Sequence, residues 1–295
     1  MSKKKKNKRR VLKWILLVLI FMLPICLIIL LSIPIATTFN LSVNTELLEY
    51  EVTDQVNSEL PIKHAVMYNS DTDSIGVFYG TFKLAVGSTV NIQRIGFGPI
   101  SIRIEGKNGQ SAGNFKYLSD EQRSKPASDF IEFVYNNIES NVLEGVSYIV
   151  PITGNVELGR NVSFETLSSP TALLRKGRVV VIGKSLLSND YYKSATHELN
   201  IGDEFRIVEP QSKAYGFATV NENVGMTVAY KVIGKEGRIL TPGPRDENSG
   251  YPIALSYLSK IENDSFFKGI SLCIALLISL ATLIPFIADF YKTKT

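Results

Sequence analysis

The sequence predicts a membrane protein in which two transmembrane helices flank a mainly β extracytoplasmic domain, a sandwich or a small barrel, with one or two short helices. Three observations carry this prediction. Residues 14–36 and residues 269–288 contain no charged side chain. Apolar and polar residues alternate along much of the chain between these two segments, as they do in strands with one buried face. This central region contains no cysteine, so its fold cannot depend on disulfides.

The two uncharged segments have the length of membrane-spanning helices. At about 1.5 Å per residue they would extend over roughly 34 and 30 Å, which matches the roughly 30 Å of a bilayer hydrocarbon core. A cleaved signal peptide is the alternative for residues 14–36, but the apolar core of a signal peptide usually has about 7 to 15 residues. We therefore expect an uncleaved anchor. For residues 269–288 the alternative is a buried core helix.

The charges beside the first segment predict its orientation. Eight cations precede it, whereas no Lys or Arg follows it until Lys63. Under the positive-inside rule, residues 1–13 form a basic cytoplasmic tail, residues 37–267 an extracytoplasmic domain and residues 289–295 a second cytoplasmic tail. The cations expected at the membrane surface are Lys3, Lys4, Lys5, Lys6, Lys8, Arg9, Arg10 and Lys13. We expect an integral protein of the plasma or inner membrane, with the central domain periplasmic or extracellular.

The central domain is acidic although the chain as a whole is basic. Residues 37–267 contain 21 Lys and Arg against 27 Asp and Glu, a net charge of −6. This balance argues against a nucleic-acid partner, because phosphate binding requires clustered cations. The basic tail either binds anionic lipid headgroups or serves only to set the topology. Cys26 and Cys273 both lie in the apolar segments and are interpreted as small apolar residues.

Alternating apolar residues predict about a dozen short antiparallel strands between the two segments. The strand-like stretches are residues 39–52, 62–68, 75–84, 90–92, 100–104, 146–164, 173–182, 199–207, 215–220 and 226–233. Residues 188–196 are expected to form a polar loop.

Two stretches predict helices within this domain. Residues 119–122 have the spacing of a capping box, and apolar residues recur at helical spacing after Pro126, which predicts a helix over residues 126–140. This helix would divide the domain into sub-parts at residues 37–118 and 145–240. A second helix is expected over residues 252–261, just before the last apolar segment.

Three stretches resemble known ligand-binding motifs but lack residues that those motifs require. Residues 177–185 resemble a phosphate-binding loop, but five residues separate the glycines, and four of those five are β-branched and favour a strand ending in a turn. Residues 96–99 lack the third glycine and the following helix of a dinucleotide fingerprint, which leaves a turn. Residues 69–73 begin like a calcium loop, but Ser74 and Gly80 stand where the turn glycine and the bidentate glutamate should be.

No catalytic, cofactor or metal site is predicted. His64 and His197 are the only histidines and have no cysteine partners, so structural or surface roles are favoured over metal binding. We interpret the chain as a binding, scaffolding or assembly component of an envelope complex, with the lipid bilayer and other membrane or envelope proteins as partners. The alternatives are a membrane-tethered hydrolase of envelope polymers, using a histidine or a carboxylate such as Glu198 or Asp203, and a sensor subunit.

Overall fold

The computed structural model describes residues 18, 22, 24–26, 28–33, 37–54, 58–69, 74–117, 120–135, 148–159, 172–210, 213–220, 224–242 and 250–292. The chain divides into two compact units. Unit 1 comprises Met1–Ile35, Gly183–Ser194 and Leu255–Thr295, and unit 2 comprises Ala36–Ile182 and Ala195–Ala254.

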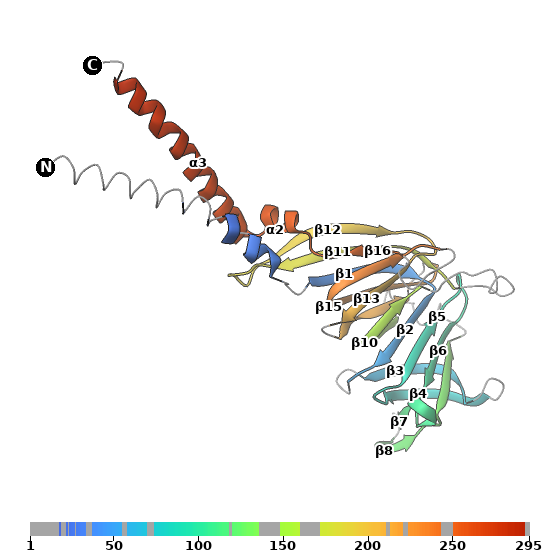
Figure 1. Ribbon diagram of the computed structural model, residues 1–295. Helices are drawn as coiled ribbons and strands as arrows, with labels where there is room; N and C mark the ends of the chain where they lie inside the picture. Colours follow the sequence, from blue (N-terminus) through green and yellow to red (C-terminus); the bar gives the residue numbers. More distant parts are fainter. Residues whose placement is uncertain are drawn as a thin grey trace. The chain divides into compact units, whose positions relative to one another are not determined.

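Unit 2 is built from strands, which confirms the predicted β-rich domain (Figure 1). In chain order the strands are β1 (Thr37–Thr45), β2 (Leu47–Val52), β3 (Glu59–Tyr68), β4 (Ser74–Leu84), β5 (Thr89–Gln93), β6 (Ile100–Glu105), β7 (Gly113–Tyr117), β8 (Asp120–Pro126), β9 (Phe130–Tyr135), β10 (Tyr148–Leu158), β11 (Leu174–Lys184), β12 (Tyr191–Leu199), β13 (Glu204–Pro210), β14 (Ala214–Val220), β15 (Met226–Leu240) and β16 (Tyr251–Ile253). A short 3₁₀ turn, Lys107–Gly109, connects β6 to β7.

The strands belong to one continuous sheet in the order β12-β11-β1-β15-β13-β10-β2-β5-β6-β9-β3-β4-β7-β8. The strand pairs with described registers are antiparallel. Strands β13 and β14 both lie between β10 and β15, at different positions along them, because each pairs with both strands. Strand β16 pairs with the last part of β15. Most strands predicted from alternation are therefore present, and β15 continues to Leu240, beyond its predicted end.

Aromatic rings from β4, β7 and β9 fill the core of the first half of the sheet. Phe133 lies 5.4 Å from Phe82 and 5.7 Å from Phe78, measured between ring centroids. Phe115 contacts the same cluster at 5.1 Å from Phe82. All four side chains are buried, and aromatic pairs at this spacing add to the stabilisation that burial provides.

The predicted helix over residues 126–140 is wrong. Residues 130–135 form β9, which pairs with β6 on one side and β3 on the other, and residues 136–140 lie outside the described part of the chain. Ile131, Phe133 and Tyr135 are buried while the residues between them are half-buried, which is a period of two. Five of the six residues in this strand are apolar, so helical and strand spacings could both be read from them. Pairing on two edges decides for the strand.

Two further predictions need correction. The polar loop expected over residues 188–196 is a strand from Tyr191 onward, because β12 pairs with β11. The helix expected over residues 252–261 begins only at Tyr257, since Tyr251–Ile253 pairs with β15 as β16.

Unit 1 contains two consecutive helices, α2 (Tyr257–Asn263) and α3 (Ser265–Lys292). Ser256 caps α2 by accepting a hydrogen bond from the Ser259 N–H. Residues 269–288 lie within α3, as expected for a helix there. Among the described residues, no single helix meets the length and hydropathy of a membrane span, whereas Tyr257–Asn263 and Ser265–Leu280 meet it together, with an 82° bend between them.

Two buried charges organise the contacts of unit 1. Asp264, at the break between α2 and α3, accepts hydrogen bonds from the Ser185 hydroxyl at 2.7 Å and from the N–H groups of Leu186 and Phe266 at 3.2 and 2.9 Å. The Lys260 ammonium donates to the carbonyl oxygens of Leu31 and Ile33 at 3.0 and 3.2 Å, where helical residues 28–32 end. Lys260 and Asp264 therefore bind two segments that are distant in sequence, residues 31–33 and residues 185–186, to α2 and the break that follows it.

A candidate cation-lined cavity

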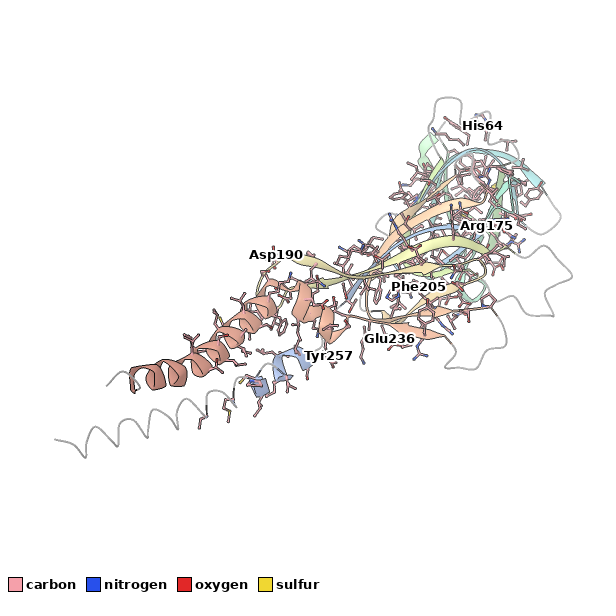
Figure 2. The ribbon with its side chains drawn as sticks, turned by 90° about the horizontal axis from the view of Figure 1, so that it is seen from above. His64, Arg175, Asp190, Phe205, Glu236 and Tyr257 are labelled. Carbon is pink, nitrogen blue, oxygen red and sulfur yellow. The ribbon has the colours of Figure 1, made fainter. Side chains whose placement is uncertain are left out.

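A cavity of about 830 Å³ opens on unit 2, lined by residues of β1 and β11, the end of β12 with the turn that follows it, and the segment that begins β15. Its polar lining includes three cations within four residues of β11, the Glu198 carboxylate and short hydrogen-bonding side chains of β1 and β15. The lining residues are Ser42, Val43, Asn44, Arg175, Lys176, Gly177, Arg178, Glu198, Ile201, Val224 and Thr227. Figure 2 labels Arg175 among the side chains of this unit.

A β-bulge explains why the cations gather on one face. Strand β1 pairs with β11 so that Asn44 opposes Lys176 while the next residue, Thr45, opposes Leu174. Arg175 is therefore the extra residue, and Arg175 and Lys176 are both exposed although a regular strand would send them to opposite faces. Gly177 permits the close approach of the two strands, because a Cβ atom there would meet the Val43 side chain at 2.3 Å.

The bulged arginine is held by a buried carboxylate. Glu46 Oε1 accepts hydrogen bonds from Arg175 Nη2 at 2.6 Å, Arg175 Nε at 3.0 Å and the Gly96 N–H at 3.0 Å, and its Oε2 accepts from the Leu173 N–H at 3.2 Å. Burial by itself would raise the pKa of Glu46, but the hydrogen bonds from Arg175 and the two backbone N–H groups outweigh burial and lower the pKa. Glu46 is therefore ionised at neutral pH and fixes the guanidinium at the cavity wall.

Arg94, a buried cation, stabilises the loops beside Glu46. Arg94 donates from Nη1 to the Gly225 carbonyl at 2.7 Å, and its backbone N–H donates to the Glu46 carbonyl at 2.9 Å. The Gly225 N–H in turn donates to the Gly96 carbonyl at 2.8 Å. The turn that carries Gly96 and the turn that begins β15 are thereby joined to the β1–β2 connection.

The other two cations of the cavity are available to a ligand. Lys176 and Arg178 are exposed, and neither makes an ion pair with another residue in the part of the chain that the structure describes. Glu198, exposed on the neighbouring strand β12, supplies one negative charge to the lining. A guanidinium and an ammonium beside hydroxyl and amide groups form a site suited to a carboxylate or a phosphate. Arg178 can bind either group through two parallel hydrogen bonds.

A cluster of three carboxylates lies elsewhere on the sheet. Glu49 of β2 and Glu157 of β10 are directly opposed neighbours, which places their Cβ atoms about 4.5 to 5.5 Å apart. Partial burial first, and then the charges of Glu49 and Glu204, raise the pKa of Glu157 although its side chain is exposed to solvent, and Arg206 acts in the opposite direction. Asn91 donates to Glu49 Oε2 at 3.2 Å. Two neighbouring carboxyl groups, one of them with a raised pKa, are an arrangement that acid–base catalysis uses.

The histidines and carboxylates considered from sequence do not meet in one place. His64 lies in β3 with a positive φ of 52°, and its ring contacts Tyr79 at 5.0 Å between centroids (Figure 2). His197 is half-buried in β12. Asp203 is buried and accepts a hydrogen bond from the Asn200 N–H at 2.7 Å, so it stabilises a turn. Of this set, Glu198 alone lines the cavity.

The motifs rejected from sequence are indeed strands and turns where they are described. Residues 177–184 belong to β11, and the following Ser185 begins a turn that its N–H closes onto the Asp190 carbonyl. The Gly98 N–H donates to the Ile95 carbonyl, which makes residues 95–98 a turn. Residues 70–73 of the calcium-like stretch and all eight cations of the N-terminal tail lie outside the described residues. No group of three or more His, Cys, Asp or Glu within the described residues is placed to hold a metal ion.

Sequence reasoning missed the cavity, although a signal was present. Residues 175–178 place three cations within four positions of a domain with a net charge of −6. Comparison of the chain with protein-family models, curated proteins and solved structures finds no match. The case for a function therefore depends on the site itself.

We predict that Glu46→Gln lowers the free energy of unfolding by about 1 to 3 kcal/mol at neutral pH, because the amide cannot satisfy the same donors. The pKa of Glu46 is lower in the folded than in the unfolded chain, so its stabilisation is complete above the unfolded value of 4.5 and is lost as pH falls through the folded value. Urea titrations at neutral pH and at about pH 3 should show a difference between wild type and variant that shrinks in acid.

Glu59→Gln is the matched control. Glu59 pairs with Lys116 at the same 2.6 Å, but both side chains are substantially exposed. Its loss should change the free energy of unfolding by less than about 1 kcal/mol. Equal effects of the two substitutions would contradict the role assigned to Glu46.

Proposed function

We propose that this chain is a membrane-anchored, extracytoplasmic binding or scaffolding component of an envelope complex, which holds an anionic group of its partner in the cavity lined by Arg175, Lys176 and Arg178. The observation that carries the proposal is the cluster of cations that a β-bulge and the buried Glu46 carboxylate position on an acidic domain.

Anchoring at both ends is supported by the two uncharged segments and by their flanks. Residues 269–288 are helical, and their described leucines are largely exposed, as side chains facing lipid would be. Residues 14–36 have the same composition, and eight cations precede them. An anchored domain of this kind is suited to holding partners beside the membrane.

Binding of an anionic group is supported by the size and lining of the cavity. Its volume of about 830 Å³ is within the range of ligand sites, about 300 to 1,000 Å³. Arginine and lysine recognise carboxylates and phosphates, which occur on acidic polymers and on acidic protein segments. Because the surrounding domain is acidic, the cations provide a local attraction that the rest of the surface does not.

The first test of the proposal concerns topology. A reporter fused after Thr295 should lie in the cytoplasm, whereas a reporter fused directly after residue 36 should lie on the opposite side, since eight cations hold the N-terminus inside. Paired alkaline phosphatase and fluorescent-protein fusions measure this. Reporters on the same side of the membrane at both positions would refute the two-span topology.

The second test concerns the cavity. In a full-length, detergent-solubilised chain whose eight tail cations are replaced by Gln, we expect the double variant Lys176→Glu/Arg178→Glu to weaken binding of poly-L-glutamate about tenfold or more, because attraction becomes repulsion over the same site. Fluorescence anisotropy of a labelled polymer gives the affinity, and rising salt should weaken wild-type binding.

The matched control for this test is Lys63→Glu/Lys125→Glu. It changes the net charge by the same amount at exposed positions of β3 and β8, which do not line the cavity. The control should retain nearly wild-type affinity. If both double variants bind equally poorly, the cations act only through overall charge and the cavity is not the site.

The carboxylate cluster favours one second candidate, a tethered hydrolase of envelope polysaccharide in which Glu157 is the acid and Glu49 the base or nucleophile. This alternative predicts that Glu157→Gln lowers the rate of glycosidic-bond cleavage by a factor of about 10² to 10⁴ while the melting temperature is retained. Release of reducing ends from envelope polysaccharide is the measurement, with Glu132→Gln on β9 as control. Equal activity of wild type and Glu157→Gln would exclude this candidate.

A further inference from the structure

The hairpin formed by β11 and β12 ends in unit 1, beside the helices. We call residues 184–191, which make its turn, the hairpin tip. Asp264 binds the tip through the Ser185 hydroxyl and the Leu186 N–H, and it also caps the first turn of α3 through the Phe266 N–H. One carboxylate thus sets the tip at the level where α3 begins.

A tight ring contact adds to this attachment. The Tyr192 ring lies against Gly183 so closely that a Cβ atom there would meet the ring at 2.5 Å. Burial first, and the Asp264 charge second, raise the pKa of Tyr192 to about 12, so its ring is neutral at any physiological pH. The hairpin tip is therefore held by packing as well as by hydrogen bonds.

The tip and α2 expose large side chains around the start of α3. Leu187 is 73% exposed, Leu258 64%, Tyr257 61% and Tyr191 60%. We call these four residues the apolar collar. Figure 2 shows Asp190 of the tip and Tyr257 of α2 beside the first turns of α3. Four exposed residues of this size, gathered from two separate segments, indicate a surface that is covered in use.

The level of the collar matches the edge of a bilayer. The uncharged part of α3 begins at Gly269, five residues after Asp264, which is about 7.5 Å along a helix. Groups bound to Asp264 would then lie in the headgroup and acyl boundary, where amphipathic segments bury about 5 to 10 Å. Tyrosine is enriched at this depth because its ring is apolar and its hydroxyl is wet.

The exposed cations near the collar complement lipid phosphates, whereas Asp190 of the tip and Glu262 of α2 are exposed acidic residues. Lys184, Lys193 and Lys268 are exposed and flank the tip and the first turn of α3. Long lysine side chains beside apolar residues can reach phosphates while their methylenes remain in the boundary. Lys260, by contrast, is buried on the carbonyl oxygens of Leu31 and Ile33 and does not take part.

We propose that the apolar collar is embedded in the interface of the outer leaflet, with Leu187 reaching the acyl boundary, the two tyrosines at headgroup level and the three lysines on lipid phosphates. The tip is bound to Asp264, five residues before the uncharged part of α3, which favours lipid over a protein partner. The hairpin tip then attaches unit 1 to the membrane surface in addition to the helical anchors. This inference rests on the anchoring in the proposed function.

Tryptophan fluorescence tests the inference in the full-length chain, because Trp14 is its only tryptophan. The background variant Trp14→Phe is combined in turn with Leu187→Trp, with Leu276→Trp in α3 and with Val77→Trp on β4, where Val77 is 67% exposed. Each protein is reconstituted in phosphatidylcholine and phosphatidylglycerol vesicles with and without lipids brominated in the acyl chain.

The expected result is that bromination quenches Leu187→Trp and Leu276→Trp about twofold or more and leaves Val77→Trp unchanged, with blue-shifted emission from the tryptophan at 187. Quenching at 276 without quenching at 187 would overturn the collar and leave the anchoring intact. A blue shift at 187 that bromination does not quench would show a protein cover instead, and would also overturn it. Absence of quenching at 276 would refute the anchoring itself.

Discussion

The arrangement of unit 2 depends on the hydrogen-bond ladder of its longest strand, β15. Its first nine residues pair with β1 on one edge, and β14 and then β13 occupy the other edge. At Gly234 the pairing with β1 ends, and from Gly237 onward β16 takes its place. Buried backbone groups must find partners, so a strand of this length brings together segments from both ends of the domain.

Small residues in β15 allow the core to close over the ladder. A Cβ atom at Gly237 would meet the Phe205 ring at 2.8 Å, so the glycine makes room for a ring that is fully buried. Phe205 in turn lies 6.1 Å from Phe39 of β1, measured between ring centroids. Backbone pairing and side-chain packing therefore favour the same register, because a slip of one residue would turn these rings toward water.

Three ionisable groups that the structure buries, Glu46, Lys260 and Asp264, each meet several hydrogen-bond donors or acceptors. Glu46 receives four hydrogen bonds and holds a bulged arginine at the cavity. Asp264 joins a hairpin to a helix start, and Lys260 satisfies carbonyl oxygens at the end of a helix. Burial lowers the pKa of Lys260, while Asp264 opposes that change. Taking these charges out of water is costly, so each one specifies a geometry as well as contributing stability.

The local pattern of the sequence was sufficient for the β-rich class and for most strands of unit 2. Alternation over residues 90–92, 100–104 and 226–233 predicted strands correctly, since each has one buried face. The same reasoning rejected a phosphate loop at residues 177–185, because β-branched residues favour a strand. It also placed a helix across residues 269–288.

Tertiary pairing decided the rest. The apolar residues of 130–135 fit both helical and strand spacing, and pairing with the neighbours β3 and β6 makes the segment a strand. Residues 191–196 are polar enough to resemble a loop, yet β11 provides them with an edge. The candidate site could not be predicted from local sequence patterns, because it too depends on pairing between distant segments. Arg175 becomes a cavity residue through a register shift against β1 and through a carboxylate 129 positions away in the chain. Composition and periodicity are properties of short segments, whereas a bulge, a buried ion pair and a cavity exist only once distant segments are paired.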